Sequence, residues 1–415
     1  MRAKIIFANR YFYPDLSATS QMLSDLSERL AQAGIEVHVV CSRQLYEEPA
    51  ARLPAREFVR NVCVHRVWTA RFGRDRLLGR ALDYLSFYFT AAAKLLALTR
   101  RGDIVVIKTD PPLLSVIGAV VATARGANLV NWLQDVFPEV ASRLYARALP
   151  RWTERALQFV RDRSLKAATV NVVLGTRMRN YIISRGVAPE QTRVIENWAD
   201  GVALRPKPVS ESALRRELAL QDRFIVAYSG NLGRAHEFET IVEAAERLRT
   251  DPLFTFLIIG GGAKFSALQL RVTQRGLANS FRFLPYQPRQ ALADSLAAAD
   301  VHLACLLPEL EGLIVPSKIY GILAAGRPAI FIGDPDGELA RVLREGGCGI
   351  TVKCGDGGGL AQELRALSMD TQRAQAMGRS ARVLFESRYT LEHAAQEWLQ
   401  MLAAEWRADC VAESQ

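Results

Sequence analysis

The sequence lacks the cysteine patterns of a zinc-binding or disulfide-stabilised protein. Its six cysteines form no CxxC pair and have no histidine at metal-ligand spacing: Cys41, Cys63, Cys305, Cys348, Cys354 and Cys410. Several stand in apolar, strand-like runs, where a free cysteine behaves as a small hydrophobic residue. The sequence therefore predicts a reducing, cytoplasmic compartment and no metal site.

Long hydrophobic runs are also missing. The opening stretch "MRAKIIFANRYFYP" has too short an apolar run for a signal peptide, and no window reaches 18 uninterrupted apolar residues. Hydrophobic residues make up 49% of the chain and charged residues 23%, as in a soluble globular protein. We therefore expect no membrane-spanning helix.

Acidic residues are too few to balance the basic ones. The net charge is +10 and the isoelectric point is about 9.5. An excess of this size indicates an anionic partner, which charge alone does not identify: nucleic acid, a membrane surface and phosphorylated small molecules all qualify, as does a generally basic soluble protein. No nucleic-acid-binding motif accompanies the charge, so we expect no nucleic-acid partner.

Short apolar runs alternate with amphipathic stretches in both halves of the chain. Six strand candidates fall in each half, at 4–8, 37–42, 62–68, 104–110, 129–135 and 168–174, then at 224–230, 254–261, 280–286, 301–307, 328–333 and 349–354. Such runs separated by helices are typical of parallel sheets covered on both faces. The predicted fold class is α/β, with two Rossmann-like, doubly wound domains and a ligand cleft at the carboxyl ends of the strands.

A length of 415 residues also favours two domains. We place the first at 1–200 and, because of its proline, serine and charge, a linker at 201–218. The second domain follows at 219–388. The last helix, at 389–415, is expected to cross back to the first domain.

Three strand ends of the second domain carry glycine or basic residues before a helix: "YSGNLGRAHEF", "IIGGGAKFSAL" and "VPSKIYGILAAGRP". Helix starts and cations attract anions, although glycine after a strand is often only a turn. Together the three predict a ligand that carries a diphosphate. The patterns GxxxxGK[ST] and GxGxxG are absent, which counts against a P-loop protein and a nicotinamide dehydrogenase.

Several motifs resemble those of the GT-B glycosyltransferases of family 4, in particular the bacterial branch that builds exopolysaccharide, capsule, lipopolysaccharide or O-antigen. They are "YFYPDLSATSQMLSDLSERLA", "TDPPLLS", "WLQDVFPEVA", "VIENWAD", "YSGNLGRAHEFET", the Pro-Ser-Lys helix start and "IFIGDPDGELARVL". The resemblance implies a retaining transferase that needs no metal and no cofactor. Its C-terminal domain would hold a nucleotide sugar such as a UDP-sugar, and its N-terminal domain would hold the acceptor.

The resemblance also implies the residues of the donor site. The positions that match are Gly230, Asn231, Arg234, His236, Lys264, Ser317, Lys318, Tyr320 and Glu338, with Glu311 as an acid near the sugar. Glu309 is an alternative to Glu311. The chain departs from most relatives at Gly321, where they carry a glutamate, and from many at Asn231 and His236, where they carry arginine and lysine.

On the acceptor side, Asp135 is the predicted catalytic residue, either orienting the acceptor hydroxyl or accepting its proton. The alternative is that Asp135 caps a helix or loop. Asp15, Ser17, Thr19 and Glu139 are the other acceptor-side candidates.

Residues 69–101 contain seven arginines and lysines against two aspartates, with large apolar residues at helical spacing. A helix of this kind can lie in a membrane interface, or it can be a crossover helix on the sheet. With the resemblance, it predicts a peripheral protein on the inner face of the cytoplasmic membrane. Its acceptor would be a polyprenyl-diphosphate-linked saccharide. The alternatives are a nucleotide-sugar epimerase or hydrolase, and an inactive partner that binds sugar nucleotides.

Overall fold

The computed structural model describes residues 3–48, 50–73, 77–145 and 150–412, with the backbone alone for residues 77 and 406–412. The chain divides into two compact units. Unit 1 is Met1–Glu196 together with Ala394–Gln415, and unit 2 is Asn197–His393. The last helix, α15 (Leu391–Ala412), begins in unit 2 and continues in unit 1.

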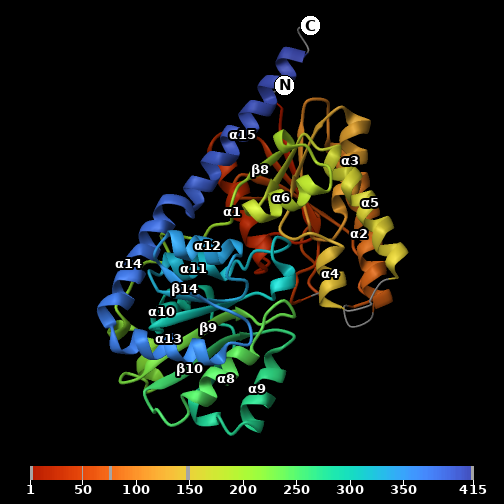
Figure 1. Ribbon diagram of the computed structural model, residues 1–415. Helices are drawn as coiled ribbons and strands as arrows, with labels where there is room; N and C mark the ends of the chain where they lie inside the picture. The colour runs from red at the N-terminus through yellow and green to blue at the C-terminus, as the bar shows by residue number, and fades with distance from the viewer. Residues whose placement is uncertain (1–2, 49, 74–76, 146–149, 413–415) are drawn as a thin grey trace. The chain divides into compact units, whose positions relative to one another are not determined.

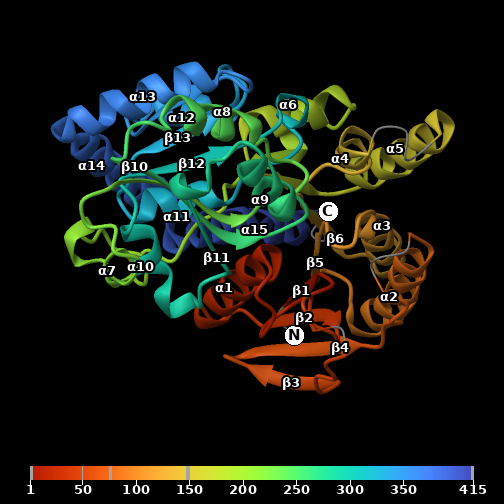
Figure 2. The same ribbon diagram turned by 90° about the horizontal axis from the view of Figure 1, so that it is seen from below.

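Unit 1 is built on a sheet with the strand order β3-β4-β2-β1-β5-β6-β7-β8. Figure 2 labels the strands from β3 to β6. All neighbours are parallel except β3 and β4, which form an antiparallel hairpin at the edge. The order reverses between β1 and β5, which makes this the topological switch point. The strands are β1 (Ile5–Ala8), β2 (Val37–Ser42), β3 (Arg56–Val59), β4 (Val62–Val67), β5 (Ile104–Lys108), β6 (Asn128–Trp132), β7 (Val170–Val173) and β8 (Thr192–Val194).

The helices of unit 1 cover this sheet, and α2, α3 and α5 lie beside one another in Figure 1. The helix α3 ends at Gly126, whose φ of +64° is the left-handed conformation that glycine adopts without strain. The helices are α1 (Ala18–Gln32), α2 (Leu77–Leu98), α3 (Leu114–Arg125), α4 (Glu139–Leu144), α5 (Arg151–Lys166) and α6 (Thr176–Ser184).

The helix α2 has two apolar sides. Phe87, Ala91 and Leu95 are wholly buried against the sheet, as in a crossover helix. The opposite side is exposed, and the stretch Leu78–Leu98 is long and apolar enough, at a mean hydropathy of 1.2, to pass as a membrane span by length and composition. Charged residues interrupt the run, which is why the sequence predicted no such helix.

Unit 2 contains an all-parallel sheet with the order β11-β10-β9-β12-β13-β14. Its switch point lies between β9 and β12. The six strands predicted for this half are all present, as β9 (Phe224–Asn231), β10 (Phe254–Gly261), β11 (Phe281–Leu284), β12 (Val301–Cys305), β13 (Ala329–Ile332) and β14 (Gly349–Val352). The predicted α/β class with two doubly wound domains is confirmed.

The strands of unit 2 are nearly continuous runs of valine, isoleucine, leucine and phenylalanine because helices cover both faces. These helices are α7 (Ala213–Glu217), α8 (Glu239–Arg247), α9 (Phe265–Gln274), α10 (Leu292–Ala297), α11 (Lys318–Ala324), α12 (Glu338–Glu345), α13 (Gly357–Met369) and α14 (Thr371–Arg388).

Residues 201–218, predicted to be a linker, are folded onto unit 2. Asp294 accepts hydrogen bonds from Nζ of Lys207 (2.6 Å) and from the backbone N–H of Ala213 (3.0 Å). Composition indicated a loose connection here, but it could not reveal the distant aspartate that holds the segment.

Candidate active site

The candidate donor site of unit 2 lies where β9 and β12 separate at their carboxyl ends. The two strands pair only at Val226 with Val301 and at Ala227 with His302. Beyond these pairs β9 continues alongside β10, up to Asn231. Ligands of doubly wound folds bind at such a point, because the neighbouring connections leave on opposite faces of the sheet.

Lys318 is the central residue of this crevice. Its Nζ contacts the hydroxyl of Tyr228 and lies 3.8 Å from the centroid of the Tyr228 ring. The hydroxyl in turn donates to the backbone oxygen of Asn231 (3.0 Å), so its oxygen accepts from the ammonium. Among the described residues, no carboxylate lies within ion-pair distance of Lys318. Burial lowers the pKa of Lys318 to about 8, which leaves the group mostly charged at neutral pH.

His236 beside this lysine is a neutral imidazole. Its Nδ1 lies 2.8 Å from the backbone oxygen of Cys305, so Nδ1 carries the proton and Nε2 is left as an acceptor. Burial, and then the charge of Lys318, lower the pKa of His236 to about 3. His236 therefore cannot supply the positive charge that a lysine supplies in relatives, but its Nε2 can accept from a hydroxyl group.

Glycine is required where β9 and β10 end. Gly262 has a φ of +120°, and a Cβ atom there would stand 2.2 Å from Oδ1 of Asn231. Gly230 has a φ of +121° and faces Cε of Lys318, at 3.8 Å from an added Cβ. The backbone beside Lys318 therefore stays free of side-chain atoms.

The remaining donor candidates differ in how they are placed. Arg234 and Ser317 are exposed, and Lys264 donates to the backbone oxygen of His236 (2.7 Å). Tyr320 is buried and packs on Tyr389 with ring centroids 5.2 Å apart, which makes it a core residue. Arg234 and Ser317 are therefore both in contact with solvent.

Glu311 and Glu338 meet at the start of α12. Oε1 of Glu311 accepts from the backbone N–H of Glu338 at 2.7 Å, and the side chain of Glu338 pairs with Arg341. The sequence interpretation placed Glu311 near the donor sugar and Glu338 in the donor site. The structure gives Glu311 a helix-capping contact, which explains why an acid stands there whether or not it touches a substrate.

Gly321 lies on α11 with apolar neighbours. A Cβ atom there would approach Cδ1 of Leu296 at 3.7 Å and Cδ1 of Leu204 at 3.8 Å, both ordinary contacts. A glutamate at this position would begin its side chain beside two leucines. The glycine that this chain carries in place of the glutamate of most relatives therefore lies in an apolar environment.

Asp135 follows the carboxyl end of β6 in unit 1, as predicted from the sequence. It lines a cavity of about 30 Å³, with Asn131 and Thr109 also in its wall. Oδ1 of Asp135 and Oδ1 of Asn131 are buried without a partner among the described residues, and the cavity has room for a water molecule between polar groups. Burial raises the pKa of Asp135, although a hydrogen bond with Thr109 opposes this shift. A carboxylate with a raised pKa is suited to accept a proton.

Asp15 and Ser17 form a closed hydrogen-bonded turn. Oδ1 of Asp15 accepts from the backbone N–H (2.9 Å) and the hydroxyl of Ser17, and the other oxygen accepts from the backbone N–H of Tyr46. Asp15 is only 5% exposed. The structure therefore gives this aspartate a role in holding the loop after β1, and Thr19 lies half-buried in the first turn of α1.

Glu139 is the anchor of a buried ion-pair network. Both of its oxygens are bound by Arg161, at 2.7 and 3.2 Å, and Tyr181 donates to the first of them at 2.7 Å. Arg161 also pairs with Asp162 (2.7 Å). These contacts occupy the carboxylate, which favours a structural role over an acceptor contact.

Lys108 is a buried cation that the sequence interpretation missed. It is the last residue of β5, beside the switch point of unit 1, and is 1% exposed. Its Nζ donates to the backbone oxygen of Thr19 (3.0 Å) and lies 3.6 Å from the centroid of the Trp132 ring. Burial lowers the pKa of Lys108 well below its ordinary value. The signal was a lysine that ends a wholly apolar run, "IVVIKTD".

Known proteins resemble both units. The family described as glycosyl transferases group 1 matches residues 210–384, and the glycosyl transferase 4-like domain matches residues 18–198. WcaI of Escherichia coli K12, named for colanic acid biosynthesis, is 28% identical over 352 residues, which cover 82% of this chain and 85% of WcaI. WbjE of Pseudomonas aeruginosa, named as a glycosyltransferase, is 29% identical over 286 residues, 67% of this chain and 69% of WbjE.

Solved structures show the same fold at low identity. Sucrose-phosphate synthase from Thermosynechococcus elongatus has a TM-score of 0.80 at 18% identity, covering 98% of this chain and 100% of its own. HepE from Anabaena, solved with UDP, has a TM-score of 0.73 at 17% identity and 97% and 100% coverage. WaaG, a glycosyltransferase of lipopolysaccharide biosynthesis, has 0.67 at 14% identity and 94% and 98% coverage. With family matches over both units and this fold, the chain belongs to the GT-B glycosyltransferases of family 4, the glycosyl transferases of group 1.

Proposed function

We propose that this glycosyltransferase moves a sugar from a nucleoside-diphosphate donor to a lipid-linked saccharide during assembly of a cell-surface polysaccharide. The single observation that carries the donor assignment is the partly buried ammonium of Lys318 at the switch point, with no carboxylate beside it among the described residues. A cation placed in this way is stabilised by an anionic ligand, and a diphosphate supplies one.

In the proposed transfer, the bond between the anomeric carbon and the donor phosphate oxygen breaks, and a bond to the acceptor oxygen forms on the same face of the sugar. The leaving diphosphate gains negative charge, which the ammonium of Lys318 stabilises. Asp135 orients the acceptor hydroxyl or accepts its proton, with a donor phosphate oxygen as the alternative acceptor of that proton. No metal and no cofactor take part in this step.

The names of similar proteins support the polysaccharide assignment. WcaI is named for colanic acid biosynthesis and WaaG for lipopolysaccharide biosynthesis. HepE has been solved with UDP and with UDP-glucose, which makes a uridine nucleotide the first donor to test.

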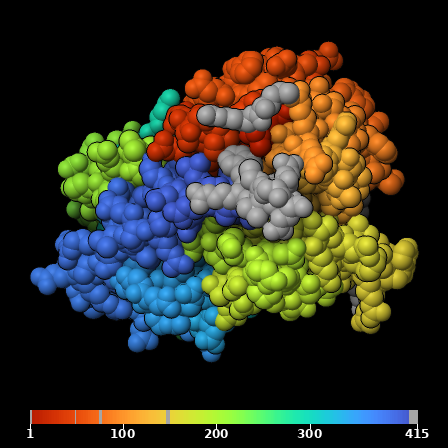
Figure 3. All heavy atoms as spheres, turned by 90° about the horizontal axis from the view of Figure 1, so that it is seen from above, coloured from red at the N-terminus to blue at the C-terminus, as the bar shows by residue number. Residues whose placement is uncertain are grey.

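An exposed apolar stripe on α2 supports the proposal that the enzyme works at a membrane surface. Its members recur at helical spacing and are Leu78 (81% exposed), Leu82 (47%), Leu85 (49%) and Phe89 (76%). Trp152 and Phe159 of α5 are also exposed, and the orange and yellow parts of the chain, which include these helices, reach the surface on one side in Figure 3. A stripe of this kind can bury its side chains between lipid headgroups, with nearby arginines at the anionic surface.

The first experiment is thermal unfolding of the purified protein with UDP, GDP, dTDP and ADP, each in EDTA and in magnesium. A ligand that binds only the folded protein raises the unfolding temperature. We expect one nucleotide to raise it equally in EDTA and magnesium, and to lose this effect in Lys318→Met. Stabilisation that requires magnesium would contradict the metal-free step, and no stabilisation at millimolar nucleotide would contradict the donor site.

Product analysis then separates the alternatives. With the matching nucleotide sugar and a polyprenyl-diphosphate-linked saccharide, we expect a glycosylated lipid whose new linkage keeps the donor's anomeric configuration by NMR. Release of free sugar or an epimer without acceptor would indicate a hydrolase or epimerase. Binding without any turnover would indicate an inactive partner.

Sedimentation with vesicles tests the membrane surface. We expect the wild type to bind vesicles that contain anionic phospholipid, and Leu78→Asp/Phe89→Asp to bind them far less. Val383→Asp, at a residue of unit 2 that is 66% exposed, is the matched control. Equal binding by all three proteins would show that α2 is not the docking surface.

A further inference from the structure

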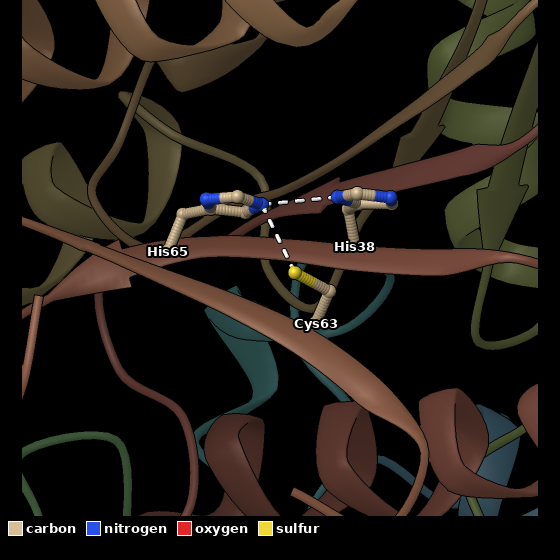
Figure 4. Close-up of side chains that lie close together, drawn as sticks. All are labelled: His38, Cys63 and His65. Atoms are coloured by element: carbon tan, nitrogen blue, oxygen red, sulfur yellow. Dashed lines mark hydrogen bonds between the residues drawn. The ribbon is translucent and has the colours of Figure 1, made fainter. Parts of the chain in front are cut away.

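Three potential metal ligands converge on one face of the sheet in unit 1. His38 lies on β2, and Cys63 and His65 lie on the neighbouring strand β4. The parallel register places His38 opposite Cys63, and residues two apart on a strand point to the same face. The side chains of His38, Cys63 and His65 therefore lie next to one another on this face, as Figure 4 shows.

The ligand atoms are already close to the spacing that zinc requires. Nδ1 of His38 lies 3.0 Å from Nε2 of His65, and Sγ of Cys63 lies 3.4 Å from the same nitrogen. All three atoms lie within 4.8 Å of one another. Tetrahedral zinc with bonds of about 2.0 Å to nitrogen and 2.3 Å to sulfur needs separations of about 3.3 Å between nitrogens and 3.6 Å between nitrogen and sulfur.

Glu36 orients the first histidine as an outer carboxylate does in zinc proteins. Its Oε1 lies 2.9 Å from Nε2 of His38, so this nitrogen donates to the carboxylate and Nδ1 keeps its lone pair toward the cluster. The two imidazole planes are inclined by only 6°, and the ring nitrogens face each other (Figure 4). The tautomer that a metal needs at His38 is thus present.

Burial and charge define what the site can hold. Cys63 and His65 are 4% and 5% exposed, whereas the side chain of His38 is 12% exposed and gives access from solvent. The surrounding cations are Lys4, Arg56, Lys94 and Arg100, of which Lys4 is paired with Asp103 at 3.7 Å. These cations disfavour an added metal, which limits the affinity.

We propose that His38, Cys63 and His65 bind one zinc ion, with Glu36 as the outer carboxylate and a water molecule as fourth ligand. A soft thiolate with two imidazoles selects zinc over magnesium or calcium. His38 and Cys63 are the second residues of β2 and β4, away from the carboxyl ends at which substrates of doubly wound folds bind. The zinc therefore joins the neighbouring strands β2 and β4 and takes no part in the transfer, so it stands apart from the proposed function.

The histidine and cysteine ligands were not found from the sequence because no ligand pair has the spacing of a zinc motif. Cys63 and His65 are two residues apart, and His38 belongs to another strand. The prediction of no metal site therefore rests on spacing alone, and the experiments below test it.

The test uses the full chain, stripped with EDTA, and zinc or cobalt as the probe. Competition with a chromophoric chelator should give one zinc per chain with a dissociation constant of about 1 µM or tighter. Cobalt should produce the absorption band of a cobalt–thiolate bond, and zinc should raise the unfolding temperature. Cys63→Ser should abolish the band and the tight binding.

Glu36→Gln is the variant that guards against misfolding, because the Glu36 side chain is 61% exposed. It should keep the cobalt band but weaken zinc binding about 10- to 100-fold. Cys354→Ser and His393→Gln are controls that should leave zinc binding unchanged. Any one of three results would overturn the proposal: equal zinc binding in Cys63→Ser, no cobalt–thiolate band in wild type, or a dissociation constant weaker than about 100 µM. The three side chains would then form a hydrogen-bonded cluster without metal. Nucleotide binding measured in parallel is independent of these results.

Discussion

The ammonium of Lys318 lies against both the face and the hydroxyl of Tyr228, 90 positions earlier in the chain. The ring gives the cation a partial counter-charge, and the hydroxyl fixes its position. Neither contact is an ion pair, so the charge of Lys318 is available to a diphosphate. The two contacts also hold the ammonium in position before the diphosphate binds.

Replacing Lys318 with methionine should weaken donor binding. The change removes the positive charge but keeps most of the side-chain volume, so Tyr228 keeps its packing. Charge-assisted hydrogen bonds of this kind are worth about 10- to 100-fold in affinity. Calorimetric titration with the stabilising nucleotide measures the loss, and Lys353→Met, at an exposed lysine, is the control. An affinity within twofold of wild type would show that the diphosphate binds elsewhere.

Donor affinity should also fall as the pH rises above 8. Since burial lowers the pKa of Lys318 to about 8, the free protein has a charged lysine at pH 7 and a mostly neutral one at pH 9. A bound diphosphate requires the charged form, so affinity should drop about tenfold between these pH values. Lys318→Arg stays charged at pH 9 and should bind the nucleotide equally at both. A parallel drop in Lys318→Arg would assign the pH dependence to another group.

Changing Asp135 to asparagine should reduce turnover and spare the donor. The substitution keeps the size of the side chain and the contact with Thr109 but removes the group that accepts a proton. Loss of a general base lowers kcat by about 100-fold or more. Turnover with saturating donor measures the effect, and nucleotide-induced thermal stabilisation should match wild type. Full turnover in this variant would leave Asp135 as a structural residue of its cavity.

Glu139→Ala should destabilise the protein through Arg161, whatever its effect on activity. The substitution leaves a guanidinium that is about 4% exposed without its bidentate partner, which costs about 3–5 kcal/mol. Glu28→Ala removes a surface partner of Arg60, whose side chain is 56% exposed, and should cost less than about 1 kcal/mol. Urea unfolding measures both. Equal losses in the two variants would contradict the buried network.

Two glycines in helices of unit 2 should respond in opposite ways to alanine. At Gly321 a Cβ atom makes only ordinary contacts, so alanine should raise the free energy of unfolding by about 0.5–1 kcal/mol through its better helix propensity. At Gly378 the Cβ atom would stand 2.4 Å from the backbone oxygen of Gly326, and alanine should cost about 1–3 kcal/mol. Chemical unfolding of both variants checks the pair; a loss at Gly321 would show that α11 needs glycine for another reason.

The sequence alone determined the elements and the class of fold. Apolar runs flanked by glycine and proline predict strands because they reflect local conformational preference. All six predicted strands of each half are present, from "KIIFA" to "GITVKC". The edge strand β3 (Arg56–Val59) was not predicted, because it is short and half-exposed. Basic and glycine residues at strand ends also located the Lys318 region, since parallel strands bring their carboxyl ends to one edge.

Only the tertiary structure decided what each candidate side chain does. The pairing of Glu139 with Arg161, the cap that Glu311 gives to α12 and the folded state of 201–218 depend on partners far along the chain. The same is true of the meeting of His38 with Cys63, which follows from the register of two strands. The periodicity of apolar residues predicts which face of a strand or helix a residue occupies, but not which distant residue lies on the same face. Strand order and register depend on the packing of the whole unit.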